Sequence, residues 1–289
     1  MAKVTKAVIL AAGYGTRVLP ASKAIPKEML NIVDKPAIQY SVEEALKSGI
    51  TDILVVLSRG KQDIEDHFDR KPDLELQLKN SGKEEAYQVV CEIAEMGKRI
   101  SYIRQQTQNG TGGAVMYAKQ FVGNDPFVVM YGDDVIIGED PCTAQCCRAY
   151  EKYGKAVVCM KEVPFEMVLK YCTLDVKHAE GNDYYLTNMI EKPKPEEVIT
   201  NFAILGRCVL PAKIFDILET LPTGAGGEYQ LTDAMKQLAV TEGMIGVDFT
   251  GTRYDMGNKL GIMKACVEVA LKHPEIGEGF REYLKTLEI

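Results

Sequence analysis

Short, continuous apolar runs alternate with helix-like stretches through the first 160 residues, and this alternation limits the folds open to the chain. Uninterrupted apolar runs are typical of strands buried on both faces of a parallel sheet. The expected strands are Ala7–Ala12, Ile53–Leu57, Ile100–Arg104, Phe127–Tyr131 and Ala156–Met160. The expected helices are Ala37–Ser48, Lys61–Phe68, Glu84–Met96, Gly113–Phe121 and Thr143–Tyr153. The pattern predicts an α/β fold with a Rossmann-like mixed, mainly parallel sheet flanked by helices.

The second half of the chain is less regular. Tyr171–Val176, Tyr184–Ile190 and Phe202–Val209 have strand-like composition, and no long helices separate them. We therefore expect a small antiparallel subregion at the edge of the sheet. Further helices are expected at Pro211–Glu219, Gln230–Thr241, Gly257–Leu271 and near Gly279–Leu287. Because there is no repeat, low-complexity tract or clear linker, residues 1–289 are predicted to form a single domain.

Composition excludes several classes of protein. A net charge of −7 argues against nucleic-acid binding, which usually needs a basic face. The chain has no apolar run of the roughly 18–20 residues that cross a membrane, and the N-terminal run is too short for a signal peptide. Because the chain is long and no secretion signal is recognised in it, we expect its eight cysteines to be reduced thiols in a cytoplasmic protein. None of its three histidines lies in a recognisable nucleophile motif.

A glycine-rich loop directly follows the first expected strand. Gly13 and Gly15 let the backbone turn sharply, so that its N–H groups can form a cradle for an anion. A dinucleotide-binding fingerprint does not fit, because the third glycine is replaced by Val18, and no Gly-Lys-Ser/Thr of a P-loop follows. The loop also carries Arg17 and Lys27, two cations suited to neutralising phosphate charge. We interpret it as a phosphate-binding loop.

Carboxylates follow another buried strand, at the same predicted edge of the sheet. Asp133 comes directly after Phe127–Tyr131 and Gly132, and Mg²⁺ prefers one or two carboxylates together with phosphate oxygens. Asp133 is therefore the expected metal ligand. Asp134 would either assist Asp133 at the site or serve only as a turn residue. Asp255 is a second candidate ligand, although it could instead cap the helix expected near Gly257.

The chain resembles bacterial UTP–glucose-1-phosphate uridylyltransferases, also called UDP-glucose pyrophosphorylases. The resemblance is carried by segments 11–17, 19–30, 33–36, 190–193, 203–207, 224–234 and 254–261, in the family's order. It implies a nucleotide-diphospho-sugar transferase fold and the conversion of UTP and glucose 1-phosphate into UDP-glucose and pyrophosphate. It also implies a cytoplasmic homo-oligomer, a dimer or tetramer. Residues 1–160 would then be mainly the nucleotide-binding half, 161–260 mainly the sugar-binding half, and 261–289 C-terminal helices.

The resemblance also implies roles for individual residues. Ala11, Ala12, Gly13 and Gly15 would contact the nucleotide through their backbone, with Thr16 beside them. Arg17 and Lys27 would hold the triphosphate, and Glu28, Gln105 and Gly110 would surround the uracil. Asp133 would bind Mg²⁺. Glu191 and Glu228 would hydrogen-bond sugar hydroxyls, Lys192 would hold the sugar phosphate, and Asp134, Cys172 and Asn201 would line the substrate site.

Two positions depart from the family pattern. Gly113 replaces the usual His, which is expected to leave space near the nucleotide, and Cys172 replaces the usual Gly beside the sugar. These departures keep open another sugar 1-phosphate, or dTTP, as substrate. A catalytically weak sugar-nucleotide sensor is a further alternative, against which the presence of Arg17, Lys27, Asp133 and Lys192 argues.

Overall fold

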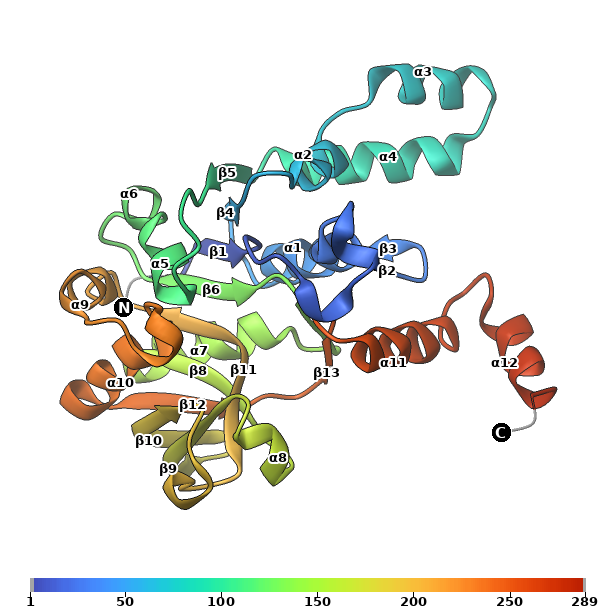
Figure 1. Cartoon of the computed structure of the whole chain (residues 1–289). Helices are drawn as coiled ribbons and strands as arrows, with labels where there is room; N and C mark the ends of the chain where they lie inside the picture. The colour runs from blue at the N-terminus through green and yellow to red at the C-terminus, as the bar shows by residue number, and fades with distance from the viewer. Residues whose placement is uncertain (1–2, 288–289) are drawn as a thin grey trace.

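A computed structural model describes residues 3–287, apart from the side chain of residue 225. Its centre is a nine-stranded sheet with the strand order β5-β4-β1-β6-β11-β8-β12-β10-β9 (Figure 1). The strands are β1 (Lys6–Leu10), β4 (Asp52–Leu57), β5 (Ile100–Arg104), β6 (Phe127–Tyr131), β8 (Val157–Glu162), β9 (Cys172–Glu180), β10 (Asp183–Glu191), β11 (Phe202–Leu210) and β12 (Met244–Asp248). Only β11 and β10 among these nine run against the others. The predicted mainly parallel sheet is confirmed, and β9 and β10 form the expected antiparallel pair at its edge, but β11 lies between β6 and β8 rather than at the edge.

Two small sheets accompany the large one. The first pairs β2 (Asn31–Ile32) with β3 (Lys35–Pro36), and the second pairs β7 (Asp134–Ile137) with β13 (Thr252–Asp255). Because β7 follows β6 after only two residues, this second pair extends from the centre of the large sheet. Its antiparallel register sets Asp134 opposite Asp255. Carboxylates that are far apart in sequence are thereby brought to one place.

Helices cover the sheet and extend beyond it (Figure 1). They are α1 (Ala37–Lys47), α2 (Gln62–Phe68), α3 (Pro72–Asn80), α4 (Glu84–Gly97), α5 (Thr111–Met116), α6 (Lys119–Val122), α7 (Cys142–Tyr153), α8 (Phe165–Val168), α9 (Ile214–Thr220), α10 (Leu231–Glu242), α11 (Lys259–Ala270) and α12 (Gly277–Lys285). The helix expected over Gly113–Phe121 is divided into α5 and α6, and α3 and β12 were not expected. Of the helices within residues 3–287, none has the length and apolar character needed to cross a membrane.

The core lies on both faces of the sheet. Successive residues of the central strands point to opposite sides, so Val8 and Val129 pack in one apolar cluster while Ile9 and Val128 pack in the other. All four are fully buried, and burying such a side chain contributes roughly 1.5–3 kcal/mol each. Because both faces of these strands are buried, their sequences do not alternate between apolar and polar residues. The parallel pairing of β1 with β6 sets the carboxyl ends of the two strands side by side.

Candidate active site

Two adjoining cavities open at the carboxyl ends of β1 and β6, where Leu10 and Tyr131 are register partners. The first, of about 440 Å³, is lined largely by the glycine-rich loop and by residues 105–114, and we call it the loop cavity. The second, of about 360 Å³, includes residues of β9, β10, β11 and β13 in its lining, and we call it the strand cavity. Thr111, Tyr131 and Asp133 line both. A ligand that spans the two cavities must pass Asp133.

The wall of the loop cavity is mainly backbone. Gly15 has φ +70°, and a Cβ there would lie 3.1 Å from the Cβ of Lys27. Gly110 has φ +102°, and a Cβ there would lie 2.5 Å from the carbonyl oxygen of Tyr229. Both positions therefore require glycine, because of their conformation and because of the close packing. The Gln108 side chain fixes the loop from across the cavity, with Nε2 donating to the Ala12 carbonyl at 2.8 Å.

Lys27 and Asp133 form a partly buried ion pair where the two cavities meet. Burial opposes both charges. Nevertheless, the Asp133 carboxylate raises the pKa of Lys27, and the Lys27 ammonium lowers the pKa of Asp133. Arg17 lies nearby, with its guanidinium 3.8 Å from Asp133 and 3.9 Å from Asp255. Its side chain is 62% exposed, so it is free to reorient toward an anion.

Asp134 is held by two arginines. The fully buried Arg207 donates to the Asp134 carbonyl at 2.9 Å and is itself paired with Glu44 at 2.6 Å. Arg253 forms an ion pair with the Asp134 carboxylate and donates to the hydroxyl of Tyr171 at 3.2 Å. Burial raises the pKa of Asp134 to about 6, although Arg253 acts in the opposite direction. These contacts make Asp134 part of a fixed framework rather than a free turn residue.

Asp255 does not cap the following helix. The N-cap of α11 is Asn258, whose side chain accepts from the N–H of Gly261 at 2.7 Å. Asp255 instead accepts from the N–H of Gly257 at 2.8 Å. A Cβ on Gly257 would lie 2.7 Å from Oδ2 of Asp133 and 2.8 Å from Oδ1 of Asp255. The two carboxylates and the Arg17 guanidinium, which is nearer still, thus surround one point that only glycine leaves clear.

This pair suits a metal that takes its remaining ligands from a substrate. Within residues 3–287, no group of three or more His, Cys, Asp or Glu side chains could hold a metal ion alone. Mg²⁺ is usually bound by one or two carboxylates together with phosphate oxygens. The donor set of Asp133 and Asp255 therefore fits a divalent metal that arrives with a nucleotide.

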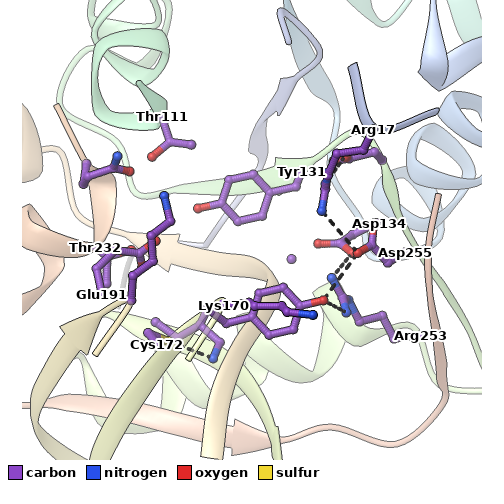
Figure 2. Close-up of a pocket in the computed structure, with 16 residues that line it drawn as sticks. Arg17, Thr111, Tyr131, Asp134, Lys170, Cys172, Glu191, Thr232, Arg253 and Asp255 are labelled. Carbon is purple, nitrogen blue, oxygen red and sulfur yellow. Dashed lines mark hydrogen bonds and ion pairs between the residues drawn. The ribbon is translucent and has the colours of Figure 1, made fainter. Parts of the chain in front are cut away.

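The opposite side of the strand cavity carries Cys172, Glu191 and Thr232, as Figure 2 shows. Cys172 and Glu191 are register partners on β9 and β10. The Cys172 thiol is buried and accepts from the N–H of Ile204 at 3.3 Å, and burial raises its pKa to about 12. Lys192 follows β10 with φ +45°, and its N–H donates to the Tyr171 carbonyl at 2.7 Å.

Most of the predicted residues lie in these cavities. The loop cavity contains Ala12, Gly13, Gly15, Thr16, Lys27, Gln105, Gly110, Asp133 and Glu228. The strand cavity contains Arg17, Asp133, Asp134, Cys172, Glu191, Lys192 and Asp255. Ala11, Glu28 and Asn201 line neither cavity.

Three placements differ from what the sequence suggested. Glu28 is fully buried and pairs with Lys61 at 2.7 Å, so its carboxylate is turned away from the loop cavity. The space expected beside Gly113 is filled, because a Cβ there would lie 1.9 Å from Oδ1 of Asn109. Glu228, expected beside sugar hydroxyls, lines the loop cavity rather than the strand cavity.

Several lining residues were not singled out from the sequence, among them Lys170, Tyr171, Thr232 and Arg253. Arg253 lies two residues before Asp255 on the short strand β13, which the sequence did not predict. Side chains at positions i and i+2 of a strand point to the same face. Tyr171 and Lys170 reach the cavity through the turn between α8 and β9, which the sequence did not reveal.

Comparison with known proteins agrees with this geometry. Residues 6–271 match the nucleotidyl transferase family. The chain is 46% identical over 289 residues to a UTP–glucose-1-phosphate uridylyltransferase of Staphylococcus epidermidis, with both chains covered completely. It is 47% identical over 285 residues to UTP–glucose-1-phosphate uridylyltransferase YngB of Bacillus subtilis, covering 99% of this chain and 96% of the relative.

Solved structures agree as well. A UTP-bound UGPase from Acinetobacter baumannii has a TM-score of 0.89 at 35% identity, covering 99% of this chain and 100% of that one. A UDP-glucose pyrophosphorylase complexed with UDP-glucose has a TM-score of 0.83 at 37% identity, covering 93% and 100%. Nucleotidyltransferases of this kind generally use a divalent metal. The chain is therefore a nucleotidyltransferase enzyme that belongs to the nucleotidyl transferase family, among the UTP–glucose-1-phosphate uridylyltransferases.

Proposed function

We propose that this enzyme transfers the uridylyl group of UTP to glucose 1-phosphate, giving UDP-glucose and pyrophosphate. The observation that carries the proposal is the meeting of the loop and strand cavities at the Lys27–Asp133 pair. A nucleotide in the loop cavity and a sugar phosphate in the strand cavity would bring their phosphates together there. A phosphate oxygen of glucose 1-phosphate then attacks the α-phosphorus of UTP, and the bond to the leaving pyrophosphate breaks.

The residues of the loop cavity bind and orient UTP in this proposal. The backbone N–H groups around Gly13 and Gly15 face its phosphates, and Lys27 neutralises them together with Arg17, which reaches them from the adjoining strand cavity. Gln105 and Gly110 contact the uracil from the far wall. Glu28 can join them only if its pairing with Lys61 rearranges, because in this conformation it is fully buried.

The residues of the strand cavity bind the sugar phosphate. Lys192 holds the phosphate, and Glu191 accepts hydrogen bonds from sugar hydroxyls. Burial raises the pKa of Glu191, although Thr232 and Lys192 act in the opposite direction. Mg²⁺ is the metal we propose, held by Asp133 and Asp255, and it supplies Lewis-acid neutralisation of phosphate oxygens when bound. Because the attacking group is already a phosphate oxygen, no protein nucleophile is required.

We also propose that the enzyme acts as one domain in a cytoplasmic homo-oligomer. All eight cysteines are free thiols, which suits a reducing compartment. Leu260, Met263 and Tyr283 are large apolar side chains that lie exposed on α11 and α12, where a second copy could cover them. Light scattering of the purified protein distinguishes monomer, dimer and tetramer.

A panel of nucleoside triphosphates and sugar 1-phosphates, assayed for pyrophosphate release and for the nucleotide sugar formed, tests the main proposal. We expect UTP with glucose 1-phosphate to give the highest kcat/KM. Higher values with dTTP or with another sugar 1-phosphate would reassign the substrate. Absence of turnover with every pair, in protein that still binds UDP-glucose, would favour a sensor instead.

A further inference from the structure

Glu28 and Lys61 form a buried ion pair next to the catalytic site, and no role described above uses it. Their charged atoms lie 2.7 Å apart, and the side chains of Glu28 and Lys61 are only 1% and 7% exposed. Neither residue lines the loop cavity or the strand cavity. Taking two charges out of water costs free energy, and an apolar pair of similar volume often gives equal or greater stability. A role other than stability is therefore expected of this pair.

The pair lies at the carboxyl ends of neighbouring strands. Lys61 follows β4 as the N-cap residue of α2, and Glu28 belongs to the loop that follows β1. In the sheet, β4, β1 and β6 lie side by side in that order and are parallel. Glu28 also reaches the end of β6, because a Cβ on Gly132 would lie 3.4 Å from its Cγ. The pair thus ties the loop after β1 to the end of β4.

Glu28 directly follows Lys27 in the chain, and the two residues have different partners. Both belong to the single 3₁₀ turn Lys27–Met29, which contacts α1 and α2. Lys27 pairs with Asp133, and Glu28 pairs with Lys61. Within residues 3–287, Lys61 is the one side chain that donates a hydrogen bond to the Glu28 carboxylate. Lys61 therefore holds the turn from which the Lys27 side chain extends.

The four side chains form a row of alternating charge, Lys61–Glu28–Lys27–Asp133. Burial lowers the pKa of Lys61, and the Glu28 carboxylate acts in the opposite direction. Burial raises the pKa of Glu28, and the ammonium groups of Lys61 and Lys27 act in the opposite direction. Each charge thus supports its neighbour against burial. Without Lys61, the row loses its end and Glu28 retains only Lys27 as a cationic neighbour.

Lys27 depends on its surroundings for a fixed position. A lysine side chain is long and flexible, and holding it in one arrangement costs rotamer entropy. A Cβ on Gly13 would lie 3.7 Å from Nζ of Lys27, so the ammonium lies against the glycine-rich loop as well as against Asp133. A small shift of the Lys27–Met29 turn would move the ammonium away from this place.

We propose that Lys61 is a positioning residue that acts through Glu28. It anchors the Lys27–Met29 turn and thereby holds the Lys27 ammonium between Asp133 and the glycine-rich loop. Lys61 itself touches neither substrate. The inference rests on the proposed function only for the identity of the phosphate that Lys27 contacts.

The test is a double-mutant cycle on kcat, measured with the substrate pair that gives the highest kcat/KM. Lys61→Met removes the ammonium and nearly keeps the length of the side chain. We expect kcat to fall at least about 10-fold, because catalysis depends on a cation that is already held in place. In a Lys27→Met background, the same change should alter kcat by less than about 2-fold, because the group through which Lys61 acts is gone.

The matched control is Lys6→Met. Lys6 pairs with Asp125 at 2.8 Å at the other end of β1, and its side chain is also largely buried. This variant removes a lysine from an ion pair that does not adjoin the site. It should therefore leave kcat within about 2-fold of the wild type.

A second variant separates position from stability. Lys61→Met leaves a buried carboxylate without its partner, which destabilises a fold. Lys61→Met/Glu28→Leu replaces the whole pair by apolar side chains and should regain the Tm that Lys61→Met loses. Its kcat should nevertheless stay at least about 10-fold below the wild type, because the anchor of the turn is still missing. If Lys61→Met does not fold, this variant takes its place in the cycle.

Three outcomes would overturn the proposal. The first is a kcat for Lys61→Met within about 2-fold of the wild type. The second is an equal fall in kcat in the wild-type and Lys27→Met backgrounds, which would show that Lys61 acts independently of Lys27. The third is recovery of kcat together with Tm in Lys61→Met/Glu28→Leu, which would leave the pair with a structural role only.

Failure of the proposed function would give a different result. A substrate other than UTP or glucose 1-phosphate changes the pair used in the assay but not the logic of the cycle. If the protein binds UTP without turnover, the same cycle is measured on the affinity for UTP by calorimetry. A loss of affinity in Lys61→Met that disappears in the Lys27→Met background would then support the positioning role, although the proposed function had failed.

Discussion

The loop cavity and the strand cavity are built in different ways. The loop cavity has a backbone wall, in which Gly15 and Gly110 take conformations that other residues rarely adopt. The strand cavity has a side-chain wall, in which Cys172 and Glu191 face the site because β9 and β10 pair in a particular register. A backbone wall is encoded by a short local motif and changes little with side-chain identity. A side-chain wall can be altered one residue at a time, which makes it the natural place for differences in sugar preference.

The largest effect is expected where the two cavities meet. Asp133→Asn keeps the shape of the side chain but removes the charge that pairs with Lys27 and that, in the proposed site, holds the metal. We expect turnover to fall by at least about 10²-fold, with KM for both substrates affected because the residue lines both cavities. Steady-state kinetics across a range of Mg²⁺ concentrations measures this. Normal activity with normal Mg²⁺ dependence would remove Asp133 from the metal site.

Cations on the two sides should separate by substrate. Arg17→Ala should mainly impair use of UTP, and Lys192→Ala use of glucose 1-phosphate, each by roughly 10²-fold in kcat/KM. Both residues line the strand cavity, but Arg17 lies 3.8 Å from Asp133, where the two cavities meet, whereas Lys192 directly follows β10. The measurement is kcat/KM for each substrate with the other saturating. Identical effects of both variants on both substrates would contradict the division into two sides.

A backbone change should disturb the loop cavity alone. Gly110→Ala places a Cβ 2.5 Å from the Tyr229 carbonyl oxygen at a φ of +102°, so the wall must shift. We expect kcat/KM for UTP to fall about 10-fold and stability to fall by about 1–3 kcal/mol, with KM for glucose 1-phosphate nearly unchanged. Gly82→Ala is the control, because Gly82 has φ +67° but nothing within 4 Å of its Cβ position. An equal loss of UTP use in both variants would refute the specific role of the wall.

The smallest effect is expected at Cys172. Its thiol is turned to the N–H of Ile204, so Cys172→Gly removes little of what a sugar would touch. We expect kcat/KM for glucose 1-phosphate, relative to galactose or N-acetylglucosamine 1-phosphate, to rise by roughly 10-fold or less. Competition assays with paired sugar phosphates measure that ratio. An unchanged ratio would make Cys172 a neutral substitution in the side-chain wall.

The same contrast explains which parts of the molecule could be predicted from sequence. The central strands were found because both their faces are buried, which leaves a continuous apolar run. The loop cavity was found because its glycines are visible in the sequence. The structure shows that Gly15 and Gly110 adopt a positive φ. The helix α3 was missed because most of its side chains are exposed and its apolar pattern is weak.

Elements that depend on distant partners could not be predicted. β7 and β13 exist only because they pair with each other, and their pairing sets Asp134 opposite Asp255. The space beside Gly113 depends on where the Asn109 side chain points, and the position of Glu28 depends on Lys61. The first is a backbone pairing between distant segments, and the other two depend on where individual side chains point, which no local pattern specifies.

The position of β11 between β6 and β8 affects how the protein is made. Synthesis delivers β6 and β8 early, but the strand that joins them is complete only at Leu210. Until then, the unpaired edges of β6 and β8 cannot form their native hydrogen bonds, and such edges template aggregation. We therefore expect a chain stalled on the ribosome near residue 160 to need chaperone protection, and a chain stalled well beyond residue 210 to resist proteolysis.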